Sequence, residues 1–141
     1  MASRLLLCCT LSGLMAGCAT MPAKPPAGPQ FDGVYQGDNR LISGFGFICE
    51  PADVPRTLTI HGGRFDYPFP VNAPRTAPLP VQIAEDGTFY GAMQYGVVTT
   101  MRFGSNYRTE WAIVSGSISG PDLQGTVSND ECTRQLAMQR H

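Results

Sequence analysis

From residue 31 onward, the chain is a succession of short segments in which apolar and polar residues alternate. The clearest example begins as Arg56-Thr57-Leu58-Thr59-Ile60, turns at His61-Gly62-Gly63 and returns as Arg64-Phe65-Asp66-Tyr67. A period of two places alternate side chains on opposite faces of a β-strand, and paired glycines suit a tight hairpin turn. No stretch after residue 30 has the spacing of an amphipathic helix. The pattern therefore predicts an all-β domain.

Further strand candidates recur at roughly ten-residue spacing and are separated by turns that contain glycine. They are Val34 to Gln36, Leu41 to Ile48, Val81 to Ala84, Thr88 to Met93, Val97 to Phe103, Glu110 to Ser119, Gln124 to Ser128 and Cys132 to Met138. Such spacing is typical of antiparallel barrels and sandwiches. We expect a single small antiparallel barrel of about eight strands over residues 31–141, with a sandwich as the alternative.

The segment 67–80 interrupts this regularity with five prolines. Proline lacks the backbone N–H that a central strand donates, so this segment is not expected to be one. A stiff surface loop around Arg75 would suit recognition of a partner. A crossover that covers a sheet edge is the alternative.

The last strand candidate carries an arginine on its apolar face. Counting by twos from Cys132 places Arg134, Leu136 and Met138 together. If that face is the core, Arg134 points inward and requires a carboxylate or carbonyl partner. It would then mark a polar ligand pocket, belong to a structural ion pair or lie at the barrel rim.

The N-terminus carries a separate signal. A short apolar run from Leu5 to Ala16 follows one basic residue, Arg4, and leads into Leu14-Met15-Ala16-Gly17-Cys18. The run is shorter than the roughly 20 apolar residues of a membrane-spanning helix and suits a secretory signal. The final residues resemble the lipobox of bacterial lipoproteins, with Met15 where leucine is commoner. That resemblance implies a signal peptide over residues 1–17 and lipidation of Cys18. A secretory signal cut elsewhere is the alternative.

The same resemblance implies a protein anchored by lipid in the cell envelope. In lipoproteins, an Asp after the cysteine favours retention in the inner membrane, and here Ala19 follows. We therefore expect the outer membrane, with the domain facing the periplasm. Residues 18–30 would form a proline-rich tether in polyproline II conformation, reaching roughly 35–40 Å at about 3.1 Å per residue.

The cysteine count agrees with this interpretation. Cys8 and Cys9 would leave with the signal peptide and Cys18 would carry lipid, so Cys49 and Cys132 remain. In an oxidising periplasm they are the natural disulfide pair, with two buried free thiols as the alternative. No metal site is expected, because only His61 and His141 could assist and neither has ligand spacing.

The composition excludes several function classes. Removal of Arg4 from the ten basic residues leaves nine against eleven acidic ones, without a basic stripe for nucleic acid. The stretch Gly116-Ser117-Ile118-Ser119-Gly120 places isoleucine where a hydrolase elbow needs its nucleophile. No glycine-rich loop precedes a helix. We therefore expect no enzyme, no cofactor and no nucleic-acid partner.

The overall plan of lipobox, proline-rich tether, β domain and disulfide is similar to that of small envelope inhibitor lipoproteins. Among them, lysozyme inhibitors are eight-stranded barrels whose recognition loop carries serine and glycine shortly before tyrosine. Here Gly104-Ser105-Asn106-Tyr107, followed by Trp111, is loosely similar. We expect a non-catalytic, monomeric domain that binds a small ligand or an envelope protein, with inhibition of a lytic enzyme as the alternative. The candidate recognition residues are Arg75, Tyr107, Trp111 and Arg134.

Overall fold

The computed structural model describes residues 24–44, 49, 54–72, 75–101 and 104–141. The expected signal peptide and Cys18 lie outside the described residues. The strands are β1 (Gly33–Gly44), β2 (Val54–Ile60), β3 (Arg64–Asn72), β4 (Arg75–Ile83), β5 (Thr88–Met101), β6 (Gly104–Ser119), β7 (Asp122–Ser128) and β8 (Cys132–Arg140). They form one eight-stranded antiparallel sheet in the order β2-β1-β8-β7-β6-β5-β4-β3.

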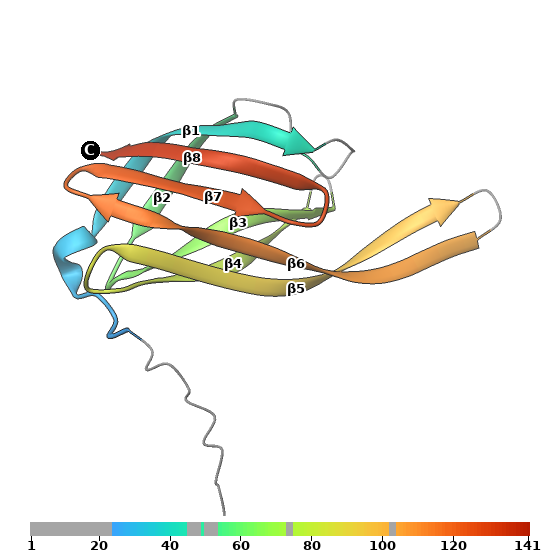
Figure 1. Ribbon diagram of the computed structural model, residues 1–141, viewed down its shortest axis with the longest axis horizontal. Coiled ribbons are helices and arrows are strands. Elements are labelled where there is room, and N and C mark those ends of the chain that lie inside the picture. The colour runs from blue at the N-terminus through green and yellow to red at the C-terminus, as the bar shows by residue number, and fades with distance from the viewer. Residues whose placement is uncertain (1–23, 45–48, 50–53, 73–74, 102–103) are drawn as a thin grey trace, which may run out of the picture.

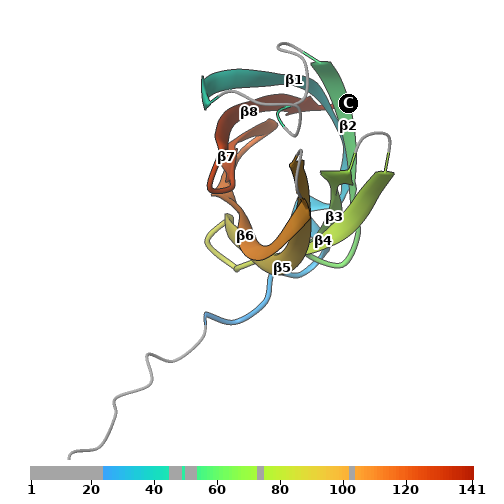
Figure 2. The ribbon, with the colours of Figure 1, turned by 90° about the vertical axis from the view of Figure 1, so that its right-hand side faces the viewer.

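This sheet curls into a nearly closed barrel (Figure 2). β1 pairs with both β2 and β8, so the first and last strands lie side by side within the sheet. The two edge strands, β2 and β3, meet at the Gly62-Gly63 turn, where His61 and Arg64 exchange backbone hydrogen bonds of 3.0 and 3.2 Å. The predicted all-β fold of about eight antiparallel strands is confirmed.

The proline-rich segment 67–80 belongs to a β-hairpin, and the prediction of a surface loop there was wrong. β3 and β4 pair from Arg64↔Gln82 to Asn72↔Arg75, with a register shift between Pro70 and Asn72. Four prolines lie within these two strands, at positions 68, 70, 78 and 80. The hairpin persists because none of these prolines has to donate a hydrogen bond within it.

The direction of neighbouring N–H groups explains this tolerance. In β3, Arg64 donates to His61 on the β2 side, so positions 68 and 70 also face β2. In β4, Ala84 donates to Thr88 of β5, so positions 78 and 80 also face β5. The missing donors therefore weaken pairing on both outer sides of the hairpin. Accordingly, β4 pairs with β5 only at Gln82↔Tyr90 and Ile83↔Phe89.

The barrel interior is packed with side chains and changes character along its length. Near the turns that join β2 to β3 and β4 to β5 it is apolar, and the Phe65 and Phe89 rings meet edge-on with centroids 5.6 Å apart. Towards the opposite end, buried polar groups enter the core, namely Asn39, Glu110 and Arg134. The described interior side chains thus form one buried cluster, as expected for the core of a small barrel.

The N-terminal segment is docked on the apolar end of the barrel from residue 24 onward. The N–H of Ala27 donates to the carbonyl of Ile83 at 2.8 Å, and Ala27 is buried. Lys24 Nζ lies 2.5 Å from Asp86 Oδ2. A short 3-10 helix, η1 (Pro29–Phe31), leads into β1. The described part of the expected tether therefore packs against the barrel and does not act as a free spacer.

At the other end, β5 and β6 continue past their neighbours as a two-stranded arm (Figure 1). We define the arm as residues 94–101 of β5 and 104–111 of β6, which pair continuously with each other. Pairing of β6 with β7 begins only at Ile113↔Ser128. The arm and the docked N-terminal segment thus lie at opposite ends of the molecule (Figure 1).

Candidate functional site

The cysteine residues form the disulfide that the sequence predicted. Cys49 and Cys132 are bonded, with their Cα atoms 5.9 Å apart and a sequence separation of 83 residues. The bond ties the segment that follows β1 to the start of β8. Within the described residues, no three His, Cys, Asp or Glu side chains gather into a group that could hold a metal ion.

Arg134 points into the barrel, and its partners belong to the protein. Its side chain is 5% exposed. Nε donates to Asn39 Oδ1 at 2.8 Å, and Nη2 donates to the Asn39 carbonyl oxygen at 2.5 Å. Asn39 in turn donates from Nδ2 to the Tyr67 hydroxyl at 2.6 Å. The inward orientation and the carbonyl partner are confirmed, and the arrangement is that of a structural network joining β1, β3 and β8.

A second polar network lies where the arm leaves the barrel. The Tyr95 hydroxyl donates to Glu110 Oε2 at 2.7 Å and accepts from Asn129 Nδ2 at 2.7 Å. The Arg108 guanidinium bridges the buried Glu110 carboxylate and the Glu131 carboxylate. Burial, and then the hydrogen bond to Glu110, raise the pKa of Tyr95. These contacts attach the base of the arm to the turn between β7 and β8.

The outer side of the arm carries a cluster of exposed apolar side chains, which we call the aromatic face. Val98, Tyr107 and Trp111 are 48%, 69% and 51% exposed. Val98 pairs directly with Tyr107 across the two strands. The Tyr107 ring lies over Gly96, where an added Cβ atom would come within 2.7 Å of Tyr107 Cε2. The missing side chain at Gly96 therefore provides the space in which the Tyr107 ring rests.

The structure brings together two of the four predicted recognition residues. Tyr107 and Trp111 are four residues apart on β6 and face the same side of the arm. Arg134 is inside the barrel, and Arg75 begins β4, with its side chain outside the described residues. Sequence reasoning missed Val98 and Gly96, because their contribution depends on a β5–β6 register that no local pattern specifies.

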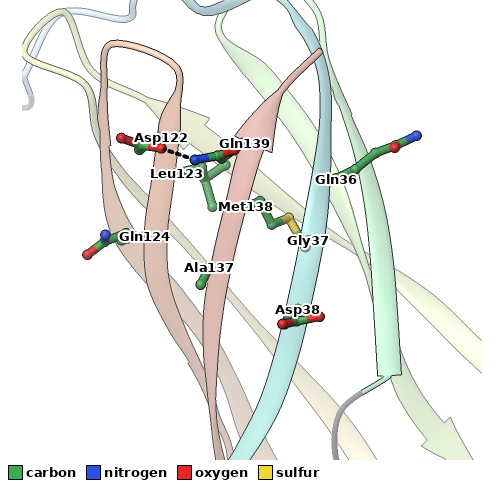
Figure 3. Close-up of a pocket in the computed structure, with 9 residues that line it drawn as sticks. All are labelled: Gln36, Gly37, Asp38, Asp122, Leu123, Gln124, Ala137, Met138 and Gln139. Carbon is green, nitrogen blue, oxygen red and sulfur yellow. Dashed lines mark hydrogen bonds between the residues drawn. The ribbon is translucent and has the colours of Figure 1, made fainter.

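A shallow depression of 320 Å³ lies on the outer surface of β1, β7 and β8 (Figure 3). Its floor includes Ala137, and polar side chains surround it, among them Asp38 and Gln124. Gln139 Nε2 donates to Asp122 Oδ1 at 3.1 Å across one side. These groups offer hydrogen bonds at an open surface, and no aromatic side chain lines the depression. The arrangement provides neither a nucleophile with a base nor an enclosed cavity.

Comparison of this chain with protein-family models, with curated proteins and with solved structures finds no match. In the described part of the chain, no helix has the length and apolar character required to cross a bilayer.

Proposed function

We propose that this protein is a non-catalytic binding protein of the bacterial cell envelope that recognises another envelope protein through the aromatic face of its arm. The observation that carries this proposal is the concentration of exposed apolar surface there. Three of the six large apolar side chains that are exposed among the described residues are Val98, Tyr107 and Trp111. Tyrosine and tryptophan are the residues that most often dominate binding energy at protein interfaces.

A protein partner fits this geometry better than a small ligand. Small molecules usually bind in enclosed, mostly apolar pockets, whereas the described interior side chains form one buried hydrophobic cluster and the outer depression is open and polar. The aromatic face is instead a projecting surface. A protein can cover such a surface and remove its rings from water, which is the main source of interface stability.

Anchoring through Cys18 suits this role. We place the protein in the outer membrane, facing the periplasm, on the resemblance of residues 14–18 to a lipobox. The docked segment that begins at Lys24 lies at the end of the barrel opposite the arm (Figure 1). A lipid attached through that segment would hold the molecule at the membrane and leave the arm available to a partner.

The recognition proposal is tested by crosslinking in intact cells. A photoreactive amino acid placed at Tyr107 of the full chain should yield a crosslinked envelope protein, and Trp111→Ala should lower that yield by about tenfold. The same amino acid at Tyr90 is the matched control, because Tyr90 is an exposed aromatic residue on β5 outside the arm. Equal crosslinking at both positions, or no effect of Trp111→Ala, would contradict the proposal.

The anchor has its own test. Cys18→Ser should move the protein from the membrane fraction to the soluble fraction and abolish palmitate labelling, because the acceptor sulfur is lost. A Cys18→Ser protein that still takes up palmitate would show that the anchor lies elsewhere.

Inhibition of a lytic enzyme is a second candidate function, because a projecting hairpin has the shape of an element that enters an active-site cleft. Gly104-Ser105-Asn106-Tyr107 forms the start of β6 in the arm, and all four residues are exposed. The full chain should then slow a lysozyme or a serine protease at submicromolar concentration, and Tyr107→Ala should relieve the inhibition. Undiminished activity across a broad panel of such enzymes would exclude this function.

A further inference from the structure

The arm has a free backbone edge along β5. Thr88 of β5 turns its carbonyl towards β4 and accepts from Ala84 at 2.7 Å. Backbone groups alternate along a strand, and the β5–β6 register runs without a shift from Thr88↔Ser117 to Met101↔Gly104. The N–H and C=O groups of Gln94, Gly96, Val98 and Thr100 therefore point away from β6. Within the described residues, no strand pairs with them.

The two outer edges of the β3–β4 hairpin are protected by proline, and the β5 edge of the arm is not. Pro68 and Pro70 remove donors on the side of β3 that faces β2, and Pro78 and Pro80 do so on the side of β4 that faces β5. Proline and charged residues are the usual means by which proteins prevent unwanted strand pairing. The β5 segment from residue 94 to 100 contains neither. The contrast with the proline-protected hairpin indicates that the β5 edge of the arm is suited to pairing with an added strand.

The residues of this edge favour strand pairing. The segment reads Gln94-Tyr95-Gly96-Val97-Val98-Thr99-Thr100, which is uncharged and rich in β-branched residues. Exposed apolar segments of this kind readily add to another strand. Val98, next to the Tyr107 ring on the outer side, would bury more of its surface against an added strand.

We propose that the β5 edge of the arm pairs antiparallel with the same edge of a second copy of this chain. Two copies of this edge can pair with each other, because a two-fold axis places the backbone donors of one copy opposite the acceptors of the other. Since the edge is uncharged, this pairing brings no like charges together. That axis would stand perpendicular to the new four-stranded sheet, so both aromatic faces would lie on one side of it. Lipid anchoring of both copies to one membrane would raise their effective concentration. The proposal replaces the monomer expected from the sequence.

The first test is the oligomeric state of the full chain in detergent, measured by light scattering and sedimentation over a concentration series. The wild-type protein should show a reversible monomer–dimer equilibrium. Val98→Pro removes an edge donor and Val98→Lys adds a charge, so each should weaken dimerisation by about tenfold or more. Tyr90→Lys is the matched control. Tyr90 is exposed on the same face of β5 as Val98, but it lies outside the arm, where β5 already pairs with Gln82 of β4. It should dimerise like the wild type.

The second test uses the unmodified protein and is independent of whether the variants fold. Hydrogen exchange at the Gly96 and Val98 amides should slow as concentration rises, because pairing protects them in the dimer. The Val97 amide faces β6 in both states, so its exchange should stay constant. A wild-type chain that remains monomeric, a dimer that both Val98 variants leave intact, or unchanged exchange at Gly96 and Val98 would overturn the proposal. Each of these results is independent of envelope-protein crosslinking at Tyr107.

Discussion

Individual polar residues inside the barrel are tolerated because their hydrogen-bonding groups meet partners. Arg134 donates to both the side chain and the main chain of Asn39, and Asn39 donates to the Tyr67 hydroxyl. Burying such groups without partners would cost several kcal/mol each, on the order of the stability of a whole domain when summed. The network therefore holds β1, β3 and β8 together at the polar end of the core.

Replacing Arg134 should destabilise the fold. Arg134→Met keeps the volume roughly constant but leaves Asn39 without two of its donors, and we expect a loss of about 3 kcal/mol. Chemical denaturation gives this value directly. Arg40→Met is the matched control, because Arg40 is on the neighbouring strand and exposed, and it should change stability by under about 0.5 kcal/mol. Similar losses in the two variants would contradict the structural role of Arg134.

The buried tyrosines should make the protein sensitive to alkali. Burial raises the pKa of Tyr67 and Tyr95, so the folded state holds their phenol protons more tightly than the unfolded chain does. Their stabilisation is complete below the unfolded pKa of about 10 and is lost as the pH rises above it. Each phenol contributes a slope of up to about 1.4 kcal/mol per pH unit. Unfolding free energies measured from about pH 9 upward should fall less steeply in Tyr95→Phe than in the wild type. Equal slopes would be inconsistent with this account.

At the scale of secondary-structure elements, each turn and strand is set by a few local requirements. The turn between β2 and β3 has positive φ at two consecutive residues, +58° at Gly62 and +69° at Gly63. Such angles favour glycine and allow the chain to reverse within two residues between β2 and β3. The β3–β4 hairpin depends instead on the side to which each proline turns its missing donor.

The two glycines of the β2–β3 turn should differ in their tolerance of substitution. Gly62→Ala meets only the strain of a left-handed residue, about 1 kcal/mol, because nothing lies near an added Cβ there. In Gly63→Ala the Cβ would also collide with the Ala27 carbonyl of the docked N-terminal segment. We expect Gly63→Ala to cost at least about 1 kcal/mol more. Denaturation midpoints of the two variants test this, and equal losses would argue against docking of residues 24–28.

At the scale of the whole molecule, the barrel joins distant parts of the chain and separates two ends. β1 pairs with β8, and the Cys49–Cys132 disulfide ties the segment after β1 to the start of β8. The docked N-terminal segment and the arm lie at opposite ends (Figure 1). This separation would suit the proposed attachment at one end and the proposed recognition at the other.

Removing the disulfide should lower stability substantially. With a sequence separation of 83 residues between its cysteines, the bond lowers the entropy of the unfolded chain and stabilises the fold by about 4–5 kcal/mol in the chain-entropy model. The double variant Cys49→Ser, Cys132→Ser should show this loss by chemical denaturation. Reductant should destabilise the wild type and leave the double variant unchanged. A wild-type midpoint that does not respond to reductant under unfolding conditions would contradict this prediction.

Much of the fold was accessible from local patterns. Alternation at Arg56 to Ile60 and Arg64 to Tyr67, with glycines between them, correctly indicated two strands joined by a tight turn, although β2 and β3 bridge each other only at His61 and Arg64. Two predicted strands are parts of one strand, since Thr88 to Met93 and Val97 to Phe103 both fall largely on β5. The proline-rich hairpin was missed because a proline disrupts a strand only when its nitrogen faces a strand that needs a donor there. Which way each nitrogen faces depends on the register of strand pairing, and the sequence does not give that register.

By itself, the sequence determined the all-β class, the approximate strand number and the shared face of Arg134, Leu136 and Met138, because each follows from a short-range period, whereas the expected pairing of Cys49 with Cys132 also rested on the lipobox resemblance. Only the tertiary structure decided that Tyr107, Trp111 and Val98 share one projecting face, that Asn39 binds Arg134, and that no strand among the described residues pairs with the outer edge of β5 in the arm. These features depend on strand register and on how far each pair of strands extends. Both are set by packing between residues distant in the chain, which no local pattern encodes.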